Sequence, residues 1–160
     1  MDDKAKKTVL QHITYGLYVI GSKGKSDANG MTANWLTQIS FDPPMVVLAV
    51  EETAHTRMLI DESKVFSVNV LPSGTPEDLL VTFTKPQKRV GNKFEKYEVT
   101  DGKATGAPIL KDALSFFECK VISQHKTGDH ILFIAEVVEA GVQKDVAPLT
   151  LNEVGWQYGG

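Results

Sequence analysis

Short runs of β-branched, aromatic and aliphatic residues, separated by turn-forming residues, recur along most of this 160-residue chain. Runs of this kind are typical of β-strands, and their close spacing leaves room for few helices. They cover residues 15–20, 31–41, 45–50, 65–71, 114–122 and 131–139. We therefore predict a mainly β, antiparallel fold, most simply a closed or partly closed barrel. A parallel sheet built from alternating strands and helices is the weaker alternative.

Two of the predicted strands have unusual patterns. Residues 31–41 mix polar and apolar side chains, which indicates a strand that is bent or interrupted. Residues 45–50 are continuously apolar, which indicates a strand buried on both faces. Between the strands, residues 21–30 are predicted to form a loop, residues 42–44 a turn and residues 123–130 a hairpin loop.

Helical patterns are few and short. Helices are predicted over residues 4–13, 56–63 and 75–83. The third should begin with Thr75 as its cap and Pro76 at the first helical position. Residues 85–113 are predicted to be rich in loops. Because no repeat or linker divides the chain, residues 1–160 are predicted to form a single domain.

Charge and cysteine content exclude several classes of protein. The formal net charge is -3, whereas nucleic-acid-binding proteins normally carry a basic face. The single cysteine, Cys119, rules out an intramolecular disulfide framework and a cysteine-based zinc cage, and it is expected to be a buried core thiol. No apolar run is long enough to span a membrane or to serve as a secretory signal. We therefore expect a cytoplasmic protein without nucleic-acid or membrane partners.

The familiar phosphate and metal motifs are incomplete in this sequence. Gly24-Lys25-Ser26 imitates the end of a phosphate-binding P-loop, but Val19 stands where that motif requires its first glycine. No Gly-x-Gly-x-x-Gly pattern is present. His125 and His130 share a predicted loop, where exposed histidines are a simpler interpretation than a metal pair. We predict no metal site.

Hydroxyl and amide side chains are concentrated in residues 29–40. A buried polar group without a partner costs about 1–3 kcal/mol, so this segment needs either solvent or a polar ligand. A ligand that combines a phosphate with a heteroaromatic ring would satisfy it. An exposed edge strand fits the same residues equally well.

A second polar cluster, residues 53–56, follows the apolar strand. If a helix begins at Thr56, its free backbone N–H groups favour an anion through both hydrogen bonds and the helix dipole. The hydroxyl of Thr56 and the nearby Arg57 would strengthen that preference. An ordinary helix cap is the plainer interpretation of the same residues.

Taken together, these segments resemble the flavin reductase-like family, whose members bind FMN on a split β-barrel. The resemblance extends from about Tyr15 to Glu139 and depends on the order and spacing of several short markers. These markers are residues 16–20, 29–35, 40–44, 45–50, 55–56, 66–71 and 128–130. The pair Asn34-Trp35 is most similar to the flavoredoxin branch of the family.

This resemblance implies a six-stranded antiparallel Greek-key barrel that forms a homodimer, with an FMN near each interface. The residues expected to line the flavin ring and its ribityl chain are Asn29, Thr32, Asn34 and Trp35, with Thr37, Gln38 and Ser40 as further contacts. The residues expected at the phosphate are His55, Thr56, Arg57 and Lys93. His130 resembles the histidine on the nicotinamide side of the flavin and is the expected catalytic residue.

The implied activity is that of an oxidoreductase that transfers a hydride or electrons between NAD(P)H and a flavin or another acceptor. The first alternative is an FMN electron carrier that serves redox partner proteins and has no pyridine nucleotide site of its own. The second is a non-enzymatic module that binds flavin or haem. Two roles stay open for Trp156 and Tyr158: cover for the end of the barrel, or replacement of an aromatic residue that covers the flavin in longer members.

Overall fold

The structure is a computed structural model that describes residues 1–25, 27–86 and 93–159. Most of the chain forms one large sheet. Its strands are β1 (Tyr18–Lys23), β2 (Ala28–Ala33), β3 (Leu36–Phe41), β4 (Pro44–Glu51), β5 (Val65–Val70), β8 (Ser115–Thr127) and β9 (His130–Val142). A small second sheet pairs β6 (Val99–Asp101) with β7 (Pro108–Leu110). The helical elements are α1 (Asp3–Gln11), α2 (His55–Ser63), α3 (Glu77–Thr84) and the 3-10 turn η2 (Lys93–Lys96).

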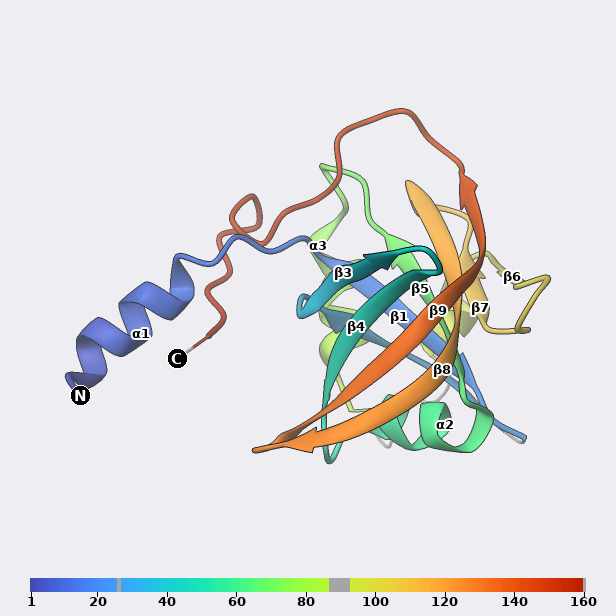
Figure 1. Cartoon of the computed structure of the whole chain (residues 1–160). Coiled ribbons are helices and arrows are strands. Elements are labelled where there is room, and N and C mark those ends of the chain that lie inside the picture. The colour runs from blue at the N-terminus through green and yellow to red at the C-terminus, as the bar shows by residue number, and fades with distance from the viewer. Residues whose placement is uncertain (26, 87–92, 160) are drawn as a thin grey trace.

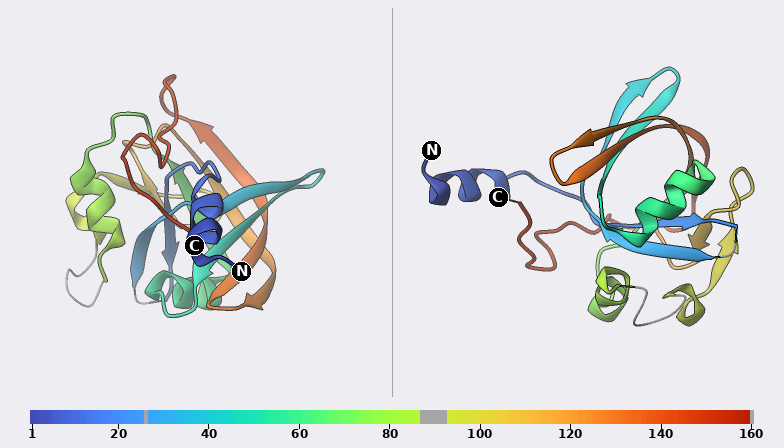
Figure 2. Two further views of the ribbon diagram at one scale, coloured as in Figure 1. Left: turned by 90° about the vertical axis from the view of Figure 1, so that its left-hand side faces the viewer. Right: turned by 90° about the horizontal axis from the view of Figure 1, so that it is seen from below.

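The large sheet is antiparallel throughout and has the strand order β2-β1-β5-β8-β9-β4-β3. It curls into a barrel, as the view from below shows (Figure 2). The predicted mainly β, antiparallel split barrel with a few short helices is therefore confirmed, and the alternating parallel sheet is wrong. The sheet has seven strands rather than six because residues 28–41 form two strands, β2 and β3, which lie at opposite edges of the sheet.

Two apolar cores lie on opposite faces of β1. One core fills the barrel and contains Ile20, Phe66 and Phe133, and the other contains Val19 and Phe83. Neither face of β1 or β5 is therefore open to solvent along the middle of the strand. The prediction that residues 45–50 are buried on both faces is wrong, because buried and half-buried residues alternate along β4. The reason is its place next to the edge strand β3, where the second core does not reach.

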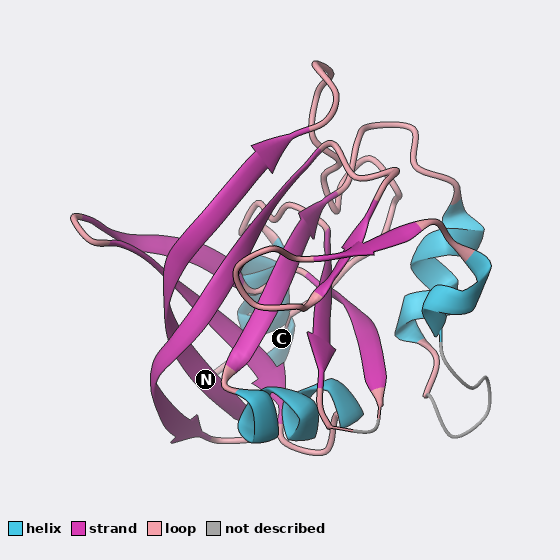
Figure 3. Cartoon of the chain, turned by 90° about the vertical axis from the view of Figure 1, so that its right-hand side faces the viewer, coloured by secondary structure: helices cyan, strands magenta, loops and turns pink. Residues whose placement is uncertain are grey.

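The helices lie around the barrel rather than between its strands. Helix α2 packs against β1 and β2 at one end of the barrel, and α3 packs against β2 at its side (Figure 3). Helix α1 projects away from the barrel and has no buried residue (Figure 1). Within the described residues, every helix falls short of the length and apolar character needed to cross a bilayer.

All three predicted helices are present, but the start of the third differs from the prediction. Helix α3 begins at Glu77, and Pro76 rather than Thr75 occupies the cap position. The hydroxyl of Thr75 donates instead to the carbonyl of Pro72 at 2.6 Å. That hydroxyl is therefore engaged by the preceding turn and does not cap the helix.

Two predicted loops are largely strand. Residues 21–30 continue β1 and β2 as a hairpin, with Lys23 opposite Ala28. Residues 123–130 continue β8 and β9 up to a turn that contains only Gly128 and Asp129. Gly128 has a φ of 50°, a left-handed conformation that glycine adopts without steric cost. Of the predicted loop 85–113, residues 87–92 lie outside the described residues, and the remainder contains η2, β6 and β7.

A buried amide on β5 attaches the small sheet to the barrel. Asn69 is fully buried, and its Nδ2 donates to the carbonyl of Val19 at 3.0 Å. Its Oδ1 accepts a hydrogen bond from the backbone N–H of Leu110 at 2.7 Å. The side chain therefore joins β5 to β1 within the barrel and to β7 outside it.

We expect Asn69→Ala to lower the free energy of unfolding by about 1–3 kcal/mol, because it removes two buried hydrogen bonds and leaves the N–H of Leu110 without its acceptor. Urea unfolding followed by circular dichroism measures the change. Asn152→Ala, at an exposed asparagine, is the matched control and should change the value by less than about 0.5 kcal/mol. Equal stability of the two variants would contradict the role assigned to Asn69.

Candidate functional site

Two adjoining cavities lie where β2, the end of β4, the start of α2 and the end of α3 meet. The larger, of about 740 Å³, contains Lys93 and is called the lysine cavity. The smaller, of about 210 Å³, contains Trp35, His130 and Tyr158 and is called the aromatic cavity. The two cavities share five of their lining residues and are therefore parts of one continuous site. The shared residues are Met31, Glu51, Ala54, Phe83 and Thr84.

The start of α2 forms one wall of the lysine cavity. Thr56 is almost completely buried there, and its hydroxyl accepts a hydrogen bond from Asn29 Nδ2 at 2.8 Å. The helix follows Ala54, and within the described residues no side chain caps its first backbone N–H groups. These N–H groups and the positive end of the helix dipole favour an anion in the cavity.

Lys93 brings a buried positive charge to the same cavity. The residue is 4% exposed, and its Nζ donates to the carbonyls of Gly30 and Phe83 at 3.0 and 3.2 Å. Burial lowers the pKa of Lys93 to about 8. The ion pairs found among the described residues do not include this ammonium group. An anionic ligand would therefore supply the negative charge that a buried cation requires.

Three aromatic side chains from distant parts of the sequence form the other end of the site. Trp35 lies between β2 and β3, and its ring centroid is 4.7 Å from that of His130 at the start of β9. Tyr158, near the C-terminus, packs edge-on against Trp35 with the ring centroids 5.3 Å apart. Planar apolar surfaces of this kind suit a planar aromatic ligand.

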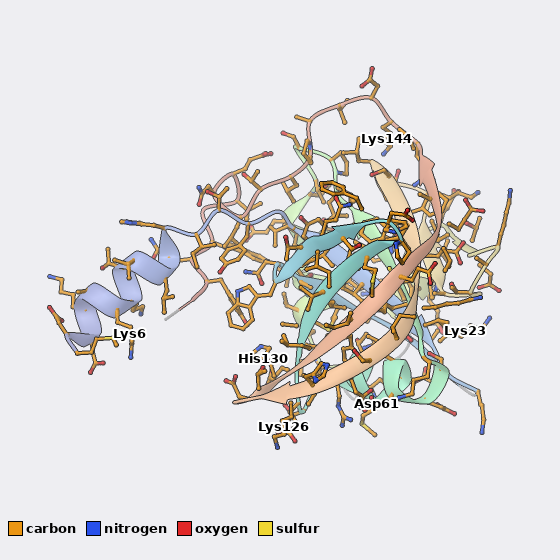
Figure 4. The ribbon with its side chains drawn as sticks, in the orientation of Figure 1. Lys6, Lys23, Asp61, Lys126, His130 and Lys144 are labelled. Carbon is orange, nitrogen blue, oxygen red and sulfur yellow. The ribbon has the colours of Figure 1, made fainter. Side chains whose placement is uncertain are left out.

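His130 is held by its neighbour Asp129. Its Nδ1 lies 2.7 Å from Asp129 Oδ1, and Figure 4 shows His130 at the end of the long hairpin, near Lys126. The hydrogen bond from His130, reinforced by the backbone and by the charge of the imidazole, lowers the pKa of Asp129. Because Nδ1 is engaged, a polar contact between His130 and a ligand would be made by Nε2.

Polar atoms without partners lie at both ends of the site and fit a ligand that supplies hydrogen bonds. Asn29 Oδ1, Asn34 Nδ2 and Trp35 Nε1 are buried, and none has a hydrogen-bond partner in the described part of the chain. Each such atom costs about 1–3 kcal/mol. If the amide of Asn29 turns over, its oxygen accepts the Thr56 hydroxyl proton and its nitrogen faces a ligand. The site thus offers donors to a ligand that carries both polar edges and a negative charge.

The structure brings together most of the residues predicted from the sequence. The lysine cavity is lined by Asn29, His55, Thr56 and Lys93, and the aromatic cavity by Thr32, Asn34, Trp35 and His130. The hydroxyl of Thr32 donates to the carbonyl of Leu80, and His55 Nε2 lies 2.8 Å from Asp27 Oδ2.

Four other predicted residues lie elsewhere. Arg57 turns away from the cavities, where it donates to the carbonyl of Glu52 and pairs with Asp61. Thr37 and Gln38 line a separate, mostly apolar cavity of about 670 Å³, and Gln38 donates to the carbonyl of Ser40. The strand β3, a largely exposed edge strand, contains Thr37, Gln38 and Ser40. The interpretation as an exposed edge strand therefore describes residues 36–40, and the ligand interpretation stays a prediction for residues 29–35.

Several residues of the site were not predicted. Glu51, Phe83 and Thr84 line both cavities, although nothing in their local sequence marks them. Phe83 and Thr84 come from the packing of α3 beside β2, and Glu51 comes from the end of β4, so only the three-dimensional structure places them in the site. Asp129 could have been predicted, because it lies next to His130 within residues 128–130, one of the markers of the resemblance.

The remaining predicted features have other environments. His125 contacts Ser123, and no group of three or more metal-ligating side chains occurs among the described residues. Cys119 is completely buried, and burial together with the charge of Glu118 raises the pKa of its thiol to about 12. Trp156 packs against the core that contains Val19 and Phe83, whereas Tyr158 reaches the aromatic cavity.

Comparison with known families agrees with this geometry. The model of the flavin reductase like domain matches residues 10–157. The chain belongs to this family. The resemblance predicted from the sequence is therefore confirmed.

Named relatives differ in length from the chain. It is 32% identical to a ferric-chelate reductase (NAD(P)H) from Archaeoglobus fulgidus, over 86% of this chain and 82% of that enzyme. It is 33% identical to a putative diflavin flavoprotein A 3 from Nostoc, over 93% of this chain but only 26% of that protein. The chain thus spans most of one relative and about a quarter of the other.

One solved structure of similar fold contains fragments of a pyridine nucleotide and of a flavin. The Streptomyces globisporus NADH:FAD oxidoreductase SgcE6, in complex with NAD and FAD fragments, superposes with a TM-score of 0.77 and 27% identity. The superposition covers 88% of this chain and 82% of that one.

Proposed function

We propose that this chain is an NAD(P)H-dependent flavin oxidoreductase that holds FMN across the lysine and aromatic cavities. The observation that carries the proposal is the set of buried, unpartnered atoms Asn29 Oδ1, Asn34 Nδ2 and Trp35 Nε1, which lie along one continuous site with the Lys93 ammonium. A flavin with a phosphate tail has a ring with polar edges at one end, which matches Asn34 and Trp35, and a negative charge at the other end, which matches Lys93. The reductases among the relatives favour this function over that of an electron carrier.

The lysine cavity is the expected seat of the phosphate. Thr56, the uncapped start of α2 and the Lys93 ammonium supply a hydroxyl, backbone N–H groups and a positive charge within one cavity. A terminal phosphate monoester carries close to two negative charges at neutral pH, and charge-assisted hydrogen bonds are the strongest available to it. This compact set of donors supports FMN over FAD, whose phosphates each carry one charge.

The aromatic cavity is the expected seat of the flavin ring. Asn34 Nδ2 and Trp35 Nε1 can donate to the polar edge of the ring, and Met31 and Ala54 supply apolar contacts. When bound, the flavin supplies the two-electron chemistry and accepts a hydride from NAD(P)H. The protein's part is to orient the reactants, to exclude water and to hold the polar groups in place.

His130 is the proposed contact for the pyridine nucleotide. Asp129 fixes its orientation through Nδ1, and the packing against Trp35 fixes the plane of its ring. The imidazole is largely covered, with 12% of its side chain exposed, so a group that meets it is partly desolvated. His130 therefore positions the nicotinamide rather than the flavin phosphate.

We expect His130→Ala to lower kcat/KM for NADH by up to about tenfold, the effect of one hydrogen bond, while the Kd for FMN changes less than about twofold. Steady-state oxidation of NADH measures kcat/KM, and a titration with FMN measures the Kd. His125→Ala, at an exposed histidine of the same hairpin, is the control and should change neither. Equal losses in both quantities would place His130 at the flavin instead.

Steady-state assays test the proposed function itself. We expect the FMN-loaded chain to oxidise NADH or NADPH with free flavin or a ferric chelate as the acceptor. A chain that retains FMN but shows no turnover with either nucleotide would be an electron carrier, and the proposal would then be wrong.

A homodimer is also proposed, since β3 and its turn leave apolar side chains in solvent. Ile39 is 47% and Phe41 is 91% exposed, and this hairpin projects from the barrel (Figure 2). The apolar cavity beside β3 offers a surface that a second copy could cover. Sedimentation equilibrium tests this proposal, and a monomer at micromolar concentration would contradict it. We further propose that residues 1–160 act as one domain in the cytoplasm.

A further inference from the structure

The C-terminal tail returns to the mouth of the aromatic cavity. After Leu151, whose N–H donates to the carbonyl of Tyr15, the chain leaves the barrel and ends beside α1 (Figure 1). Tyr158 lies on this tail and packs edge-on against Trp35, with an interplanar angle of 76°. Trp35, His130 and Tyr158 therefore line one small cavity from three distant parts of the sequence.

The aromatic cavity is too small for two ligands. Its own volume is about 210 Å³, below the roughly 300 Å³ at which pockets for small molecules usually begin, so even the flavin ring fits there only because the cavity continues into the lysine cavity. The proposed reaction brings two planar ring systems, the flavin and the nicotinamide, to this end of the site. With Tyr158 in place, the cavity therefore has no room for the second of them.

We infer that Tyr158 occupies the place of the nicotinamide, so that a pyridine nucleotide binds only after the tail has moved away. This inference depends on the proposed function, since it assigns a specificity-determining residue to the same site. Tyr158 then competes with the nucleotide and leaves the flavin in position. The apparent affinity for the nucleotide is reduced in proportion to the fraction of molecules in which the tail is open.

The contacts of Tyr158 are weak enough for such an exchange. The residue is 45% exposed, and in the described residues the backbone hydrogen bonds of the tail end at Gly155. An edge-on aromatic pair changes an equilibrium constant by about two- to tenfold. Burial, followed by the charges of Glu51 and Asp129, raises the pKa of Tyr158, so its hydroxyl stays neutral in ordinary buffers.

Calorimetric titration of NAD+ into the FMN-loaded protein tests the inference. We expect Tyr158→Ala to lower the Kd for NAD+ about two- to tenfold, with the Kd for FMN changed less than twofold. Tyr158→Phe keeps the ring and should behave as the wild type. Gln157→Ala, at an exposed neighbour on the same tail, is the matched control.

A second readout uses Trp35 and needs no ligand. Trp35 and Trp156 are the two tryptophans of the chain, so Trp156→Phe leaves the emission of Trp35 alone. In that background, Tyr158→Ala should shift the emission to longer wavelength, because the ring that covers Trp35 is removed. An unchanged emission spectrum would contradict the observed contact and the inference with it.

The inference and the proposed function fail in different ways. An unchanged or weaker affinity for NAD+ in Tyr158→Ala, or a gain in FMN affinity instead, would overturn the inference while FMN binding by the wild type still supports the site. A wild-type protein that binds no FMN would overturn both.

Discussion

Lys93→Met is expected to weaken FMN binding by about 2–5 kcal/mol, which is the usual cost of removing one partner from a buried, hydrogen-bonded charge pair. The ammonium is almost completely buried and is held by the carbonyls of Gly30 and Phe83, so it cannot be replaced by a mobile surface lysine. A loss of this size corresponds to a factor of at least about 30 in Kd. Fluorescence titration with FMN measures it.

Two comparisons identify the cause of that loss. Lys85→Met removes an exposed lysine that lines the same cavity, and it should cost less than about 1 kcal/mol. Riboflavin lacks the phosphate, so its affinity should be similar in the wild type and in Lys93→Met. If Lys93→Met bound riboflavin and FMN with the same loss of affinity relative to the wild type, Lys93 would act on the fold of the cavity rather than on the phosphate.

FMN binding is expected to weaken as the pH rises above about 8, by about tenfold per pH unit. Burial lowers the pKa of Lys93 to about 8 in the free protein, and a bound phosphate would raise it again. Below pH 8 the ammonium is charged in both states, and affinity does not depend on its titration. Above pH 8 the free protein loses the proton that the complex keeps, so binding must take up a proton and affinity falls.

The pH profile should also have a lower limit. The second ionisation of a phosphate monoester has a pKa of about 6, so affinity should decline again below that value. Titrations at several pH values between about 5 and 10, with Lys93→Met as the control, measure the profile. A wild-type affinity that stays constant from pH 7 to 10, or a variant that keeps the same decline, would contradict the role of Lys93.

The strands that face the apolar core could be predicted from the sequence, because their composition is dictated by burial. The β5 strand is an example, since its apolar residues alternate with Ser67 and Asn69. The extensions of β1, β2, β8 and β9 could not be predicted, because residues such as Lys23 and Gln124 are polar and join their neighbouring strands through backbone pairing rather than through apolar packing. Backbone pairing of this kind depends on the partner strand and leaves little signal in the local sequence.

The candidate site was predictable only in part, for a similar reason. Asn29 and Trp35 lie in a run of polar residues whose burial demands a partner, which made them visible. The same run continues into Gln38, although β3 by then lies at the other edge of the sheet. The bend at Asn34 and Trp35 separates the two halves, and no residue type marks it. Phe83 enters the site through tertiary packing alone, and the sequence left two roles open for Tyr158, which the structure places in the aromatic cavity.

The most direct test of the account is an equilibrium titration of the flavin-free chain with FMN, followed by tryptophan fluorescence. Because Trp35 lines the aromatic cavity, the account predicts saturable quenching at one FMN per chain, with FMN bound more tightly than riboflavin. Emission that does not respond to FMN, or equal affinities for FMN and riboflavin, would contradict it.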